Sequence, residues 1–380
     1  MTLNSFNWIP LQSIKESLRT GAIRLEQWQP HKLANGHRLL VSGLLLSLGL
    51  SALICTLTIL HYASPVQQKS QTVTVEVPNG VTSRAISRQL SRAGLIRSST
   101  LFNYWVQWQG ISHRLKAGTY QFNRSMSLQQ IIDQLQSGQV VLRQLAIPEG
   151  WTVNQIADLW EQTSFGSAES FLQVAGEVRW QRTYNLPGSA LEGYLFPETY
   201  RLADGSSAET AIKTMLNHFQ DQWTPRMGLA ATQIGLSQRE AIILASIIEK
   251  EAQIDSEREI ISSVFHNRLR KGWKLDADPT VLYGLGNPPR SLTRVDLRTD
   301  TPYNTYLHKG LPPGPICNPG QASIMAALRP AKTPYFYFVA SGGGGHYFSE
   351  TLDQHQRMVR RYQKSRRSQQ IAKTPDSDDY

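Results

Sequence analysis

The chain has 380 residues, of which 40% are hydrophobic and 18% charged, so it can form two or three domains with cores of their own. It contains only Cys55 and Cys317, which excludes a small scaffold held together by disulfides. The net charge of +10 raises the question of nucleic-acid binding, but the sequence has no zinc-finger spacing, RNP-type aromatic motif or basic recognition helix, so we expect no nucleic-acid partner.

The first predicted element is a transmembrane helix over residues 39–61. The run from Leu39 to Leu60 carries no charged side chain and is long enough to cross roughly 30 Å of hydrocarbon. Cations precede this run closely, at Arg24, Lys32 and Arg38. The positive-inside rule therefore places residues 1–38 in the cytoplasm and the bulk of the chain outside the plasma (inner) membrane. A cleaved signal peptide is the alternative, but the run begins far from the start of the chain and lacks a good cleavage site, which favours a retained single-pass anchor in the lipid bilayer.

After a polar linker at residues 62–71, residues 72–139 are predicted to form a small β-α-α-β subdomain followed by a helix. The expected elements are a strand over Thr72–Pro78, helices over Ser83–Ala93 and Ser99–Trp108, a strand over Gly118–Phe122 and a helix over Leu128–Leu135. Three aromatic residues of the second helix, Tyr104, Trp105 and Trp108, could stack on sugar rings. Their spacing is more typical of the packed face of a helix.

Residues 140–364 are predicted to form the main domain. It begins with a strand over Val140–Ile147 and helices over Thr152–Trp160 and Ser167–Ala175.

Two successive helices are predicted between Ser237 and Gly272. Ser237 with Glu240, and Ser256 with Glu259, each have the spacing of a capping box, so we expect a helix to start at each serine.

The first of these helices ends on a carboxylate, Glu251. At about 100° per residue, Glu251 falls within the apolar stripe of Leu244, Ile247 and Ile248, whereas Glu249 lies roughly opposite. A carboxyl group held against apolar side chains has a raised pKa and can donate a proton near neutral pH. The alternative is structural: Glu251 reaches solvent at the helix end or pairs with a cation, of which Lys250, Arg258 and Arg268 are the nearest in sequence.

The C-terminal region is predicted to hold a β-hairpin, with strands over Tyr335–Ala340 and His346–Ser349 joined by the run Gly342–Gly345. These glycines do not lead from a strand into a helix, which argues against a nucleotide-binding loop. A helix over Leu352–Lys364 and a disordered tail at 365–380 follow. The predicted fold class is α+β, with a single N-terminal transmembrane helix.

Several sequence blocks resemble those of the endolytic murein transglycosylase family, the MltG/YceG-like proteins, over about residues 73–362. The blocks are LEGYLFPETY at 191–200, ASIIEKEA around Glu251, VFHNRL at 264–269, LDADPTVLYG at 275–284, YNTY at 303–306, GLPPGPI at 310–316, NPG at 318–320 and PAKTPY at 330–335. Their order and approximate spacing are kept.

The resemblance implies an enzyme, a lyase that cleaves the β-1,4 bond between N-acetylmuramic acid and N-acetylglucosamine within peptidoglycan strands and leaves 1,6-anhydro ends. It makes Glu251 the catalytic acid and the 72–139 segment a LysM-like subdomain, which either binds glycan or only positions the main domain. It also suggests partnership with peptidoglycan synthases.

Further site residues are predicted from the family blocks and from their polar or aromatic side chains. Glu192 is assigned to substrate positioning or to tuning of Glu251, with a structural hydrogen bond as the alternative. Asp278 either shapes a turn before Pro279 or serves as a second catalytic carboxylate. The remaining candidates for binding sugar or N-acetyl groups are Thr280, Tyr283, Tyr303, Asn304 and Tyr306, whose alternative role is to anchor loops. The dispersed histidines lack metal-ligand spacing, so we expect neither a metal nor a cofactor.

Two other functions remain open at this point. A muramidase-type glycoside hydrolase would add water and leave a reducing end instead of a 1,6-anhydro end. A non-catalytic scaffold that binds peptidoglycan would not cleave the strand.

Overall fold

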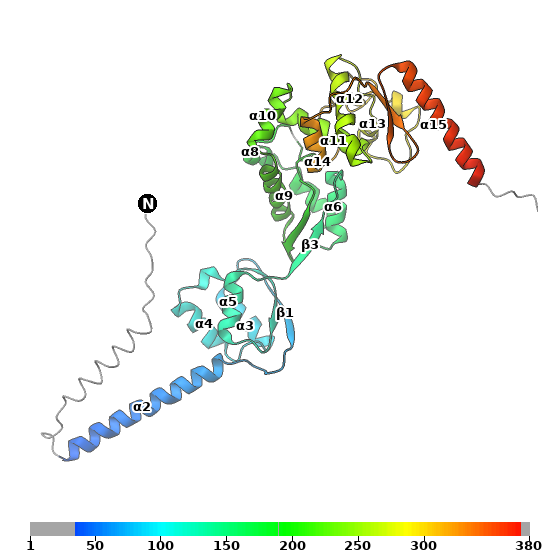
Figure 1. Ribbon diagram of the computed structural model, residues 1–380. Helices are drawn as coiled ribbons and strands as arrows, with labels where there is room; N and C mark the ends of the chain where they lie inside the picture. Colours follow the sequence, from blue (N-terminus) through cyan, green and yellow to red (C-terminus); the bar gives the residue numbers. More distant parts are fainter. Residues whose placement is uncertain (1–34, 189, 374–380) are drawn as a thin grey trace, which may run out of the picture. The chain divides into compact units, whose positions relative to one another are not determined.

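The computed structural model describes residues 35–188 and 190–373, which fall into two compact units that meet between Gln139 and Val140 (Figure 1). Both units mix helices and strands, as predicted. The segment expected in the cytoplasm lies almost wholly outside the described residues, and so does the end of the predicted tail, residues 374–380.

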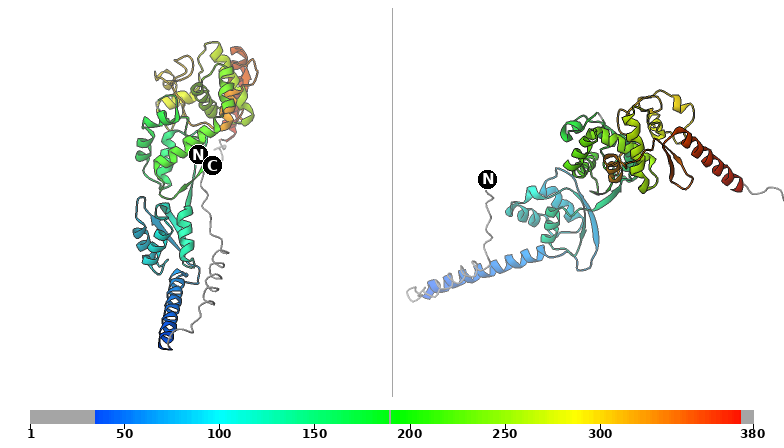
Figure 2. Two further views of the ribbon diagram at one scale, coloured as in Figure 1. Left: turned by 90° about the vertical axis from the view of Figure 1, so that its left-hand side faces the viewer. Right: turned by 45° about the horizontal axis from the view of Figure 1, so that its top comes forward.

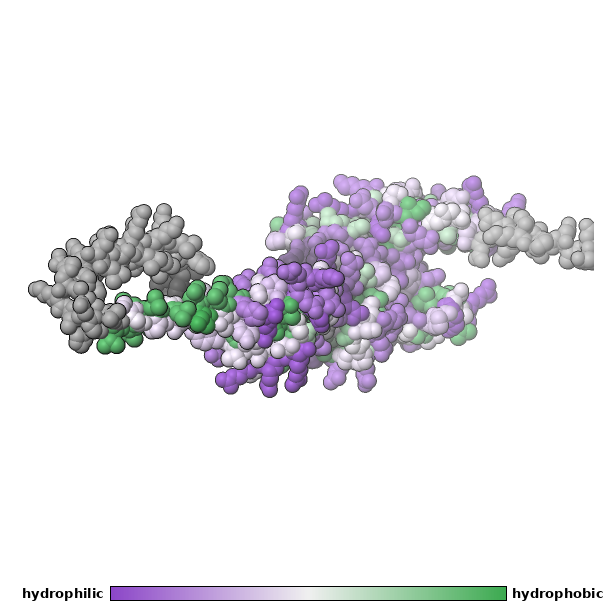
Figure 3. Space-filling model, turned by 90° about the horizontal axis from the view of Figure 1, so that it is seen from below, coloured by the Kyte–Doolittle hydropathy of each residue, from purple (hydrophilic) through white to green (hydrophobic). Residues whose placement is uncertain are grey.

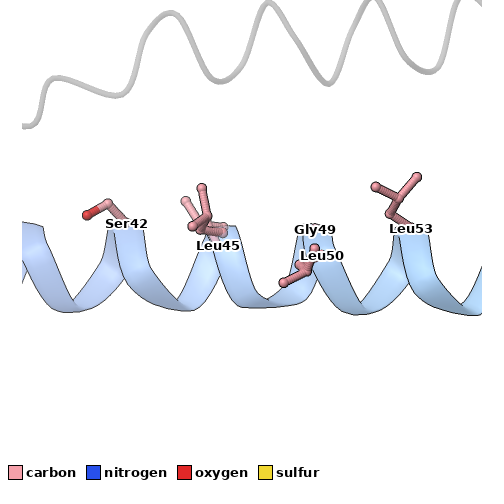
Figure 4. Close-up of a pocket in the computed structure, with 6 residues that line it drawn as sticks. Ser42, Leu45, Gly49, Leu50 and Leu53 are labelled. Atoms are coloured by element: carbon pink, nitrogen blue, oxygen red, sulfur yellow. The ribbon is translucent and has the colours of Figure 1, made fainter.

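The first unit begins with the long helix α2 (Asn35–Ala63), which contains the predicted membrane span. Its portion from Leu40 to Ala63 has a mean hydropathy of 2.2, and none of the residues in its apolar window is buried within the protein. Hydrophobic side chains line this helix in Figure 3. A hollow of about 690 Å³ on its surface is lined by Ser42, Leu45, Leu46, Gly49, Leu50 and Leu53 (Figure 4). A surface of this composition suits lipid acyl chains, so we place no functional site there.

The rest of the first unit has the predicted β-α-α-β order. Strands β1 (Thr72–Val77) and β2 (Gly118–Asn123) pair antiparallel, with Val75 opposite Tyr120. The helices are α3 (Ser83–Arg92), α4 (Ser99–Trp108) and α5 (Leu128–Ser137), and a short 3-10 turn, η2 (Ser112–Arg114), precedes β2. A side-chain hydroxyl caps the start of each α-helix, from Thr82, Ser98 and Ser127 in turn.

The linker between α2 and β1 is hydrogen-bonded to this unit. Arg97 donates to the carbonyl of Pro65 at 2.8 Å, and the backbone N–H of Gln67 donates to the carbonyl of Arg124 at 3.2 Å. Helix α2 also contacts α4 and α5. The linker is therefore held in place by contacts at several points.

The predicted packing of the α4 aromatics is wrong for two of the three residues. Tyr104 is 64% exposed and Trp108 70% exposed, whereas Trp105 is half-buried and donates to the side chain of Gln129 at 2.8 Å. The helix instead buries Phe102 and Val106. Residues four apart share a helix face, and Phe102 and Val106 take the inner one.

The second unit consists mainly of helices and contains two separate two-stranded sheets. Strands β3 (Leu142–Ala146) and β4 (Thr199–Ala203) pair antiparallel, with Leu145 opposite Tyr200. The helices of its first half are α6 (Val153–Gln162), α7 (Ala168–Ala175), α8 (Arg179–Tyr184), α9 (Ala208–Gln222) and α10 (Pro225–Gln233).

Helix α11 (Gln238–Glu251) forms the centre of this unit. All residues from Ala241 to Ile248 are buried, and the helix packs against α10, α12 (Arg258–Arg270), α13 (Asp278–Gly284) and α14 (Gln321–Leu328). The predicted capping box is confirmed: Ser237 accepts from the N–H of Glu240, and the Glu240 carboxylate accepts from the N–H of Ser237 at 2.8 Å.

The second predicted capping box is wrong. A 3-10 turn, η3 (Asp255–Glu257), precedes α12, which begins at Arg258 without a side-chain cap. Ser256 lies within this turn and is exposed. The carboxylate of the next residue, Glu257, accepts a hydrogen bond from the backbone N–H of His346. The turn therefore replaces the expected helix start.

The C-terminal hairpin forms as predicted, from β5 (Tyr337–Ala340) and β6 (His346–Ser349), with Phe338 opposite Phe348. Another 3-10 turn, η4 (Asp296–Arg298), lies between α13 and α14. Helix α15 (Leu352–Lys373) contacts both strands of the hairpin and extends beyond the predicted end at Lys364, so the first part of the expected tail is helical (Figure 2).

Candidate functional site

A cleft of about 270 Å³ opens at the C-terminal end of α11. Its lining combines three carboxylates with an arginine, a histidine, a tyrosine and apolar side chains: Glu251, Arg268, Leu275, Asp276, Asp278, Tyr306, Phe338, Val339, Ala340 and His346. These residues come from α11, α12, α13, the hairpin and two loops. The cleft therefore depends on the packing of the whole C-terminal half of the unit.

Glu251 is the last residue of α11 and is only partly exposed. Burial of the carboxyl group raises its pKa to about 8, and the negative charge of Asp278 acts in the same direction. No hydrogen bond or ion pair joins this carboxyl group to another of the described residues, so the predicted structural alternatives of pairing with Lys250, Arg258 or Arg268 do not apply there. At neutral pH Glu251 holds a proton that faces the cleft.

Asp278 and Tyr306 form a second polar group in the cleft. The hydroxyl of Tyr306 donates to Asp278 Oδ1 at 2.6 Å, and burial followed by this hydrogen bond raises the pKa of Tyr306. Asp278 starts α13, where the following Pro279 has no N–H to lose and favours helical φ. Of the predicted site residues, the structure brings Asp278 and Tyr306 together with Glu251.

Arg268 and Asp276 line the cleft, although neither was predicted as a site residue. Arg268 donates through Nη1 to Asp276 Oδ2 at 2.9 Å and to the carbonyl of Leu275 at 2.8 Å, and through Nε to the carbonyl of Phe336 at 2.7 Å. Asp276 has a positive φ of 50°. Burial raises the pKa of Asp276, and Arg268 opposes that shift. Arg268 thus fixes the loop before α13 against the hairpin.

The hairpin contributes Phe338, Val339, Ala340 and His346 to the lining of the cleft, and its histidine was also missed. The Glu257 carboxylate accepts from the backbone N–H of His346 at 2.9 Å and lies 2.7 Å from its Nδ1. The only signal in the sequence was the position of His346 directly after the glycine run. Nothing in local periodicity indicates that residue 346 pairs with residue 257.

Glu192, Tyr283 and Tyr303 lie outside the residues that line the cleft. Glu192 accepts hydrogen bonds from the N–H of Val153 at 3.2 Å, from Asn318 at 3.1 Å and from Tyr283 at 3.2 Å, and burial raises its pKa to about 7. The rings of Tyr283 and Tyr303 are 4.8 Å apart. This cluster ties the start of α6 to α13 and to the loop before α14.

Thr280 and Asn304 are fully buried, so neither side chain is available to a ligand in this structure. Thr280 is 2.9 Å from the hydroxyl of Thr305 and donates to a backbone carbonyl. Asn304 donates to the carbonyl of Thr299 at 2.8 Å and accepts from the N–H of Tyr306 at 2.9 Å. Both residues anchor the loop that carries Tyr306.

Within residues 35–188 and 190–373, no group of three or more His, Cys, Asp and Glu side chains is arranged to hold a metal ion. Cys317 is buried, and burial raises its thiol pKa well above the usual value, which disfavours the reactive thiolate. The chemistry available in the cleft is therefore that of a protonated carboxyl group beside a second carboxylate.

Comparisons with known proteins agree on one family. The family described as YceG-like matches residues 75–361. An endolytic murein transglycosylase of Bacillus subtilis (strain 168) is 35% identical over 318 residues, which cover 78% of this chain and 87% of the relative. A protein of the same name from Streptococcus pneumoniae (strain D39) is 30% identical, and the match covers 76% of this chain but 58% of that longer protein.

A solved structure supports the same assignment. The crystal structure of a putative YceG-like protein from Listeria monocytogenes is 35% identical and matches with a TM-score of 0.53. The match covers 76% of this chain and all of the other.

Proposed function

The chain belongs to the YceG-like family, and from this premise we propose how it acts as an endolytic murein transglycosylase on peptidoglycan strands. We infer that it cleaves the β-1,4 bond between N-acetylmuramic acid and N-acetylglucosamine inside the strand, so that it limits strand length. The observation that carries this proposal is the position of Glu251: an unpaired carboxyl group with a pKa raised to about 8, at the edge of a polar cleft.

In the proposed reaction, protonated Glu251 donates its proton to the glycosidic oxygen as positive charge develops at C1 of the muramic acid. The C1–O bond breaks, and the N-acetylglucosamine leaves with a free hydroxyl. The 6-hydroxyl oxygen of the same muramic acid attacks C1, and its proton passes to the Glu251 carboxylate. The enzyme is thereby returned to its starting protonation state, and the product carries a 1,6-anhydro ring. An intramolecular nucleophile has a high effective molarity, so no bound water is needed.

We assign Asp278 the role of stabilising the developing positive charge. Its carboxylate raises the pKa of Glu251, so the two groups interact electrostatically. The hydroxyl of Tyr306 holds Asp278 through the 2.6 Å hydrogen bond. If Asp278 instead activated water, the enzyme would be a hydrolase.

Mass spectrometry of the products from purified glycan strands tests the reaction type. Strands cut by the purified chain should end in 1,6-anhydro-muramic acid, which is about 18 Da lighter than a reducing end because no water is added. Reducing ends would identify a muramidase. Intact strands would leave only a binding role.

Glu192 is proposed to support the site from a distance, through the hydrogen bond that it accepts from Tyr283 of α13, the helix that Asp278 starts. The Glu192→Gln variant keeps the shape and most hydrogen bonds, so we expect nearly normal cleavage and only a small loss of stability. The Glu192→Ala variant leaves the N–H of Val153 and the amide of Asn318 unpaired, which should cost about 2–4 kcal/mol. A large loss of activity in Glu192→Gln without loss of stability would instead indicate direct contact with substrate.

We propose that α2 anchors the chain in the plasma membrane with its N-terminus in the cytoplasm and both compact units outside. The length and composition of Leu40–Ala63 support a membrane span, and the cations before the span support the orientation. Protease added to intact spheroplasts should digest the region after residue 63. Protection of that region would reverse the proposed topology.

The β-α-α-β part of the first unit is proposed to be LysM-like and to bind glycan, with Tyr104 and Trp108 as exposed stacking surfaces. Substituting both by Ala should weaken binding of glycan strands without unfolding, because neither side chain is in the core. Unchanged binding would favour the positioning role. Contact with peptidoglycan synthases is a proposal from the family resemblance alone, testable by copurification from membranes.

A further inference from the structure

His346 lines the same cleft as Glu251 at the end of α11, with one of its two ring nitrogens already engaged. Nδ1 is 2.7 Å from Oε2 of Glu257, whose Oε1 accepts the backbone N–H of the same histidine at 2.9 Å. A carboxylate can only accept hydrogen bonds, so Nδ1 carries the hydrogen in this pair. The neutral imidazole then has a lone pair on Nε2.

The second ring nitrogen, Nε2, has no such partner. No hydrogen bond joins it to another residue of the described chain, and it is not among the buried polar atoms that lack a partner, so it remains accessible to solvent. The side chain as a whole is only 9% exposed, and it lines the cleft. A residue that lines the cleft thus carries a ring nitrogen that is accessible and has no partner within the described chain.

The surroundings of His346 fix the orientation of the ring. Phe338 packs edge-on against it, with ring centroids 5.3 Å apart, and Phe348 lies 6.2 Å away on the same hairpin. At Gly345, a Cβ would come within 2.8 Å of the Glu257 carboxylate, so the absence of a side chain there lets the hairpin approach η3. A ring held by a carboxylate and two aromatic rings is arranged in advance to accept one hydrogen bond in a defined direction.

We propose that His346 is a substrate-contacting residue whose Nε2 accepts a hydrogen bond from a sugar hydroxyl of the glycan strand, and that Glu257 is the positioning residue that sets its tautomer. This inference rests on the proposed function of the cleft. It adds a polar contact from the hairpin to the cleft that Glu251 also lines.

The two ring nitrogens can be separated by substitution. In the His346→Asn variant the amide lies near the position of Nδ1 and can still donate to Glu257, but nothing replaces Nε2. In the His346→Gln variant the amide reaches the position of Nε2 and loses the bond to Glu257. We expect His346→Asn to lower kcat/KM by roughly tenfold to a hundredfold with little change in Tm, since a substrate hydrogen bond contributes about 1–3 kcal/mol. His346→Gln should keep more activity at a lower Tm. The opposite ranking of the two activities would show that His346 acts only to hold the hairpin.

A third variant tests the tautomer. Glu257→Gln keeps an oxygen to accept the backbone N–H of His346, but its amide can donate to Nδ1 and so shift the ring hydrogen to Nε2. Activity should fall by about tenfold with a smaller change in Tm than for Glu257→Ala. Unchanged kcat/KM in Glu257→Gln would contradict the assigned tautomer.

Binding to uncleaved strands separates this inference from the proposed reaction. In the Glu251→Gln background, adding His346→Asn should weaken the binding of purified glycan strands by roughly tenfold. Equal binding by the single and double variants would overturn the contact, whatever reaction the wild-type chain performs.

The matched control is His308→Asn: His308 Nε2 also pairs with a carboxylate, Asp300 at 2.8 Å, but both side chains are largely exposed and do not line the cleft. That control should bind strands as tightly as its parent.

Discussion

Glu249 and Glu251 are two positions apart at the end of α11, but only Glu249 has a cation beside it. Arg258 lies 3.8 Å from the Glu249 carboxylate, which also accepts the N–H of Gly320 at 3.0 Å. Glu251 opens on the cleft without such partners, beside the like charge of Asp278. Burial and the like charge of Asp278 raise the pKa of Glu251, whereas the Glu249 carboxylate is held by an ion pair with Arg258 and a hydrogen bond from Gly320.

The first prediction compares these two glutamates. Glu251→Gln should lower cleavage of glycan strands by at least 10²–10⁴-fold, about the range that a general acid contributes, because it keeps the shape of the side chain and removes the transferable proton. Glu249→Gln keeps an oxygen for the N–H of Gly320 and should retain activity within about threefold, with a loss of stability near 1 kcal/mol from the broken ion pair. The rate of product release from purified strands measures both.

Equal loss of activity in the two variants, at equal Tm, would mean that the pairing with Arg258 does not distinguish them. Normal turnover by Glu251→Gln would remove this residue from the reaction.

The second prediction concerns the pH dependence of the rate. The reaction needs the protonated form of Glu251, whose pKa is raised to about 8. Cleavage should therefore be insensitive to this group below about pH 7 and fall tenfold per pH unit above about 8. A pH–rate profile of kcat/KM with purified strands measures this limb. A limb centred near pH 4.5, the usual value for glutamate, would show that burial does not hold the proton.

The third prediction is that the site reduces the stability of the fold. The folded chain holds a proton on Glu251 that the unfolded chain releases between about pH 4.5 and pH 8. Since the folded-state pKa is the higher one, the resulting loss of stability is absent below pH 4.5, grows as the pH rises, and is complete above pH 8. Glu251→Gln removes this effect, so at pH 8 its second unit should melt a few degrees above wild type, at roughly 2–4 °C per kcal/mol.

Thermal melts of both proteins at pH 5 and pH 8 make the comparison. The gap between variant and wild type should widen at the higher pH. A gap that narrows would reverse the sign of the pKa shift.

The fourth prediction tests a close backbone approach beneath the site. Gly193 has a φ of 89°, and a Cβ there would lie 2.6 Å from Pro315 and 2.9 Å from Ile242 of α11. Gly193→Ala should therefore destabilise the second unit by about 3 kcal/mol or more.

Gly235 is the matched control, since its φ is 77° but no atom lies within 4 Å of the position that a Cβ would take. Gly235→Ala should cost only the conformational strain, about 1–2 kcal/mol. Equal losses by chemical denaturation would exclude the collision with α11.

Local features of the fold were predictable because they depend on short-range chemistry. The start of α11 at Ser237 follows from one capping box, and the strand His346–Ser349 follows from the glycine run before it. The helix start predicted at Ser256 is wrong, because a 3-10 turn over Asp255–Glu257 takes its place and α12 begins at Arg258. Glu257 forms a hydrogen bond with His346, 89 residues away, and no local sequence pattern indicates such a pairing.

The site was predictable only in part for the same reason. Glu251 was predicted from its place in the apolar stripe of α11 and from the family resemblance. The expected contrast with Glu249 on the opposite face is wrong, because α11 is buried on nearly all sides and the Glu249 side chain is only 7% exposed. Asn304 was a plausible sugar ligand by residue type, yet its side-chain amide forms hydrogen bonds with the backbone of its own loop. Residue type and block position do not reveal which polar groups are already satisfied within the fold.

The hydrogen-bonded segment between α2 and β1 affects where the protein can work. Because Arg97 and Arg124 form hydrogen bonds with Pro65 and Gln67, the linker after the membrane helix is held against the small unit. Once α2 is embedded in a bilayer, the small unit is kept within the thin layer next to the lipid headgroups. The small unit would then meet glycan only where glycan passes close to the bilayer surface.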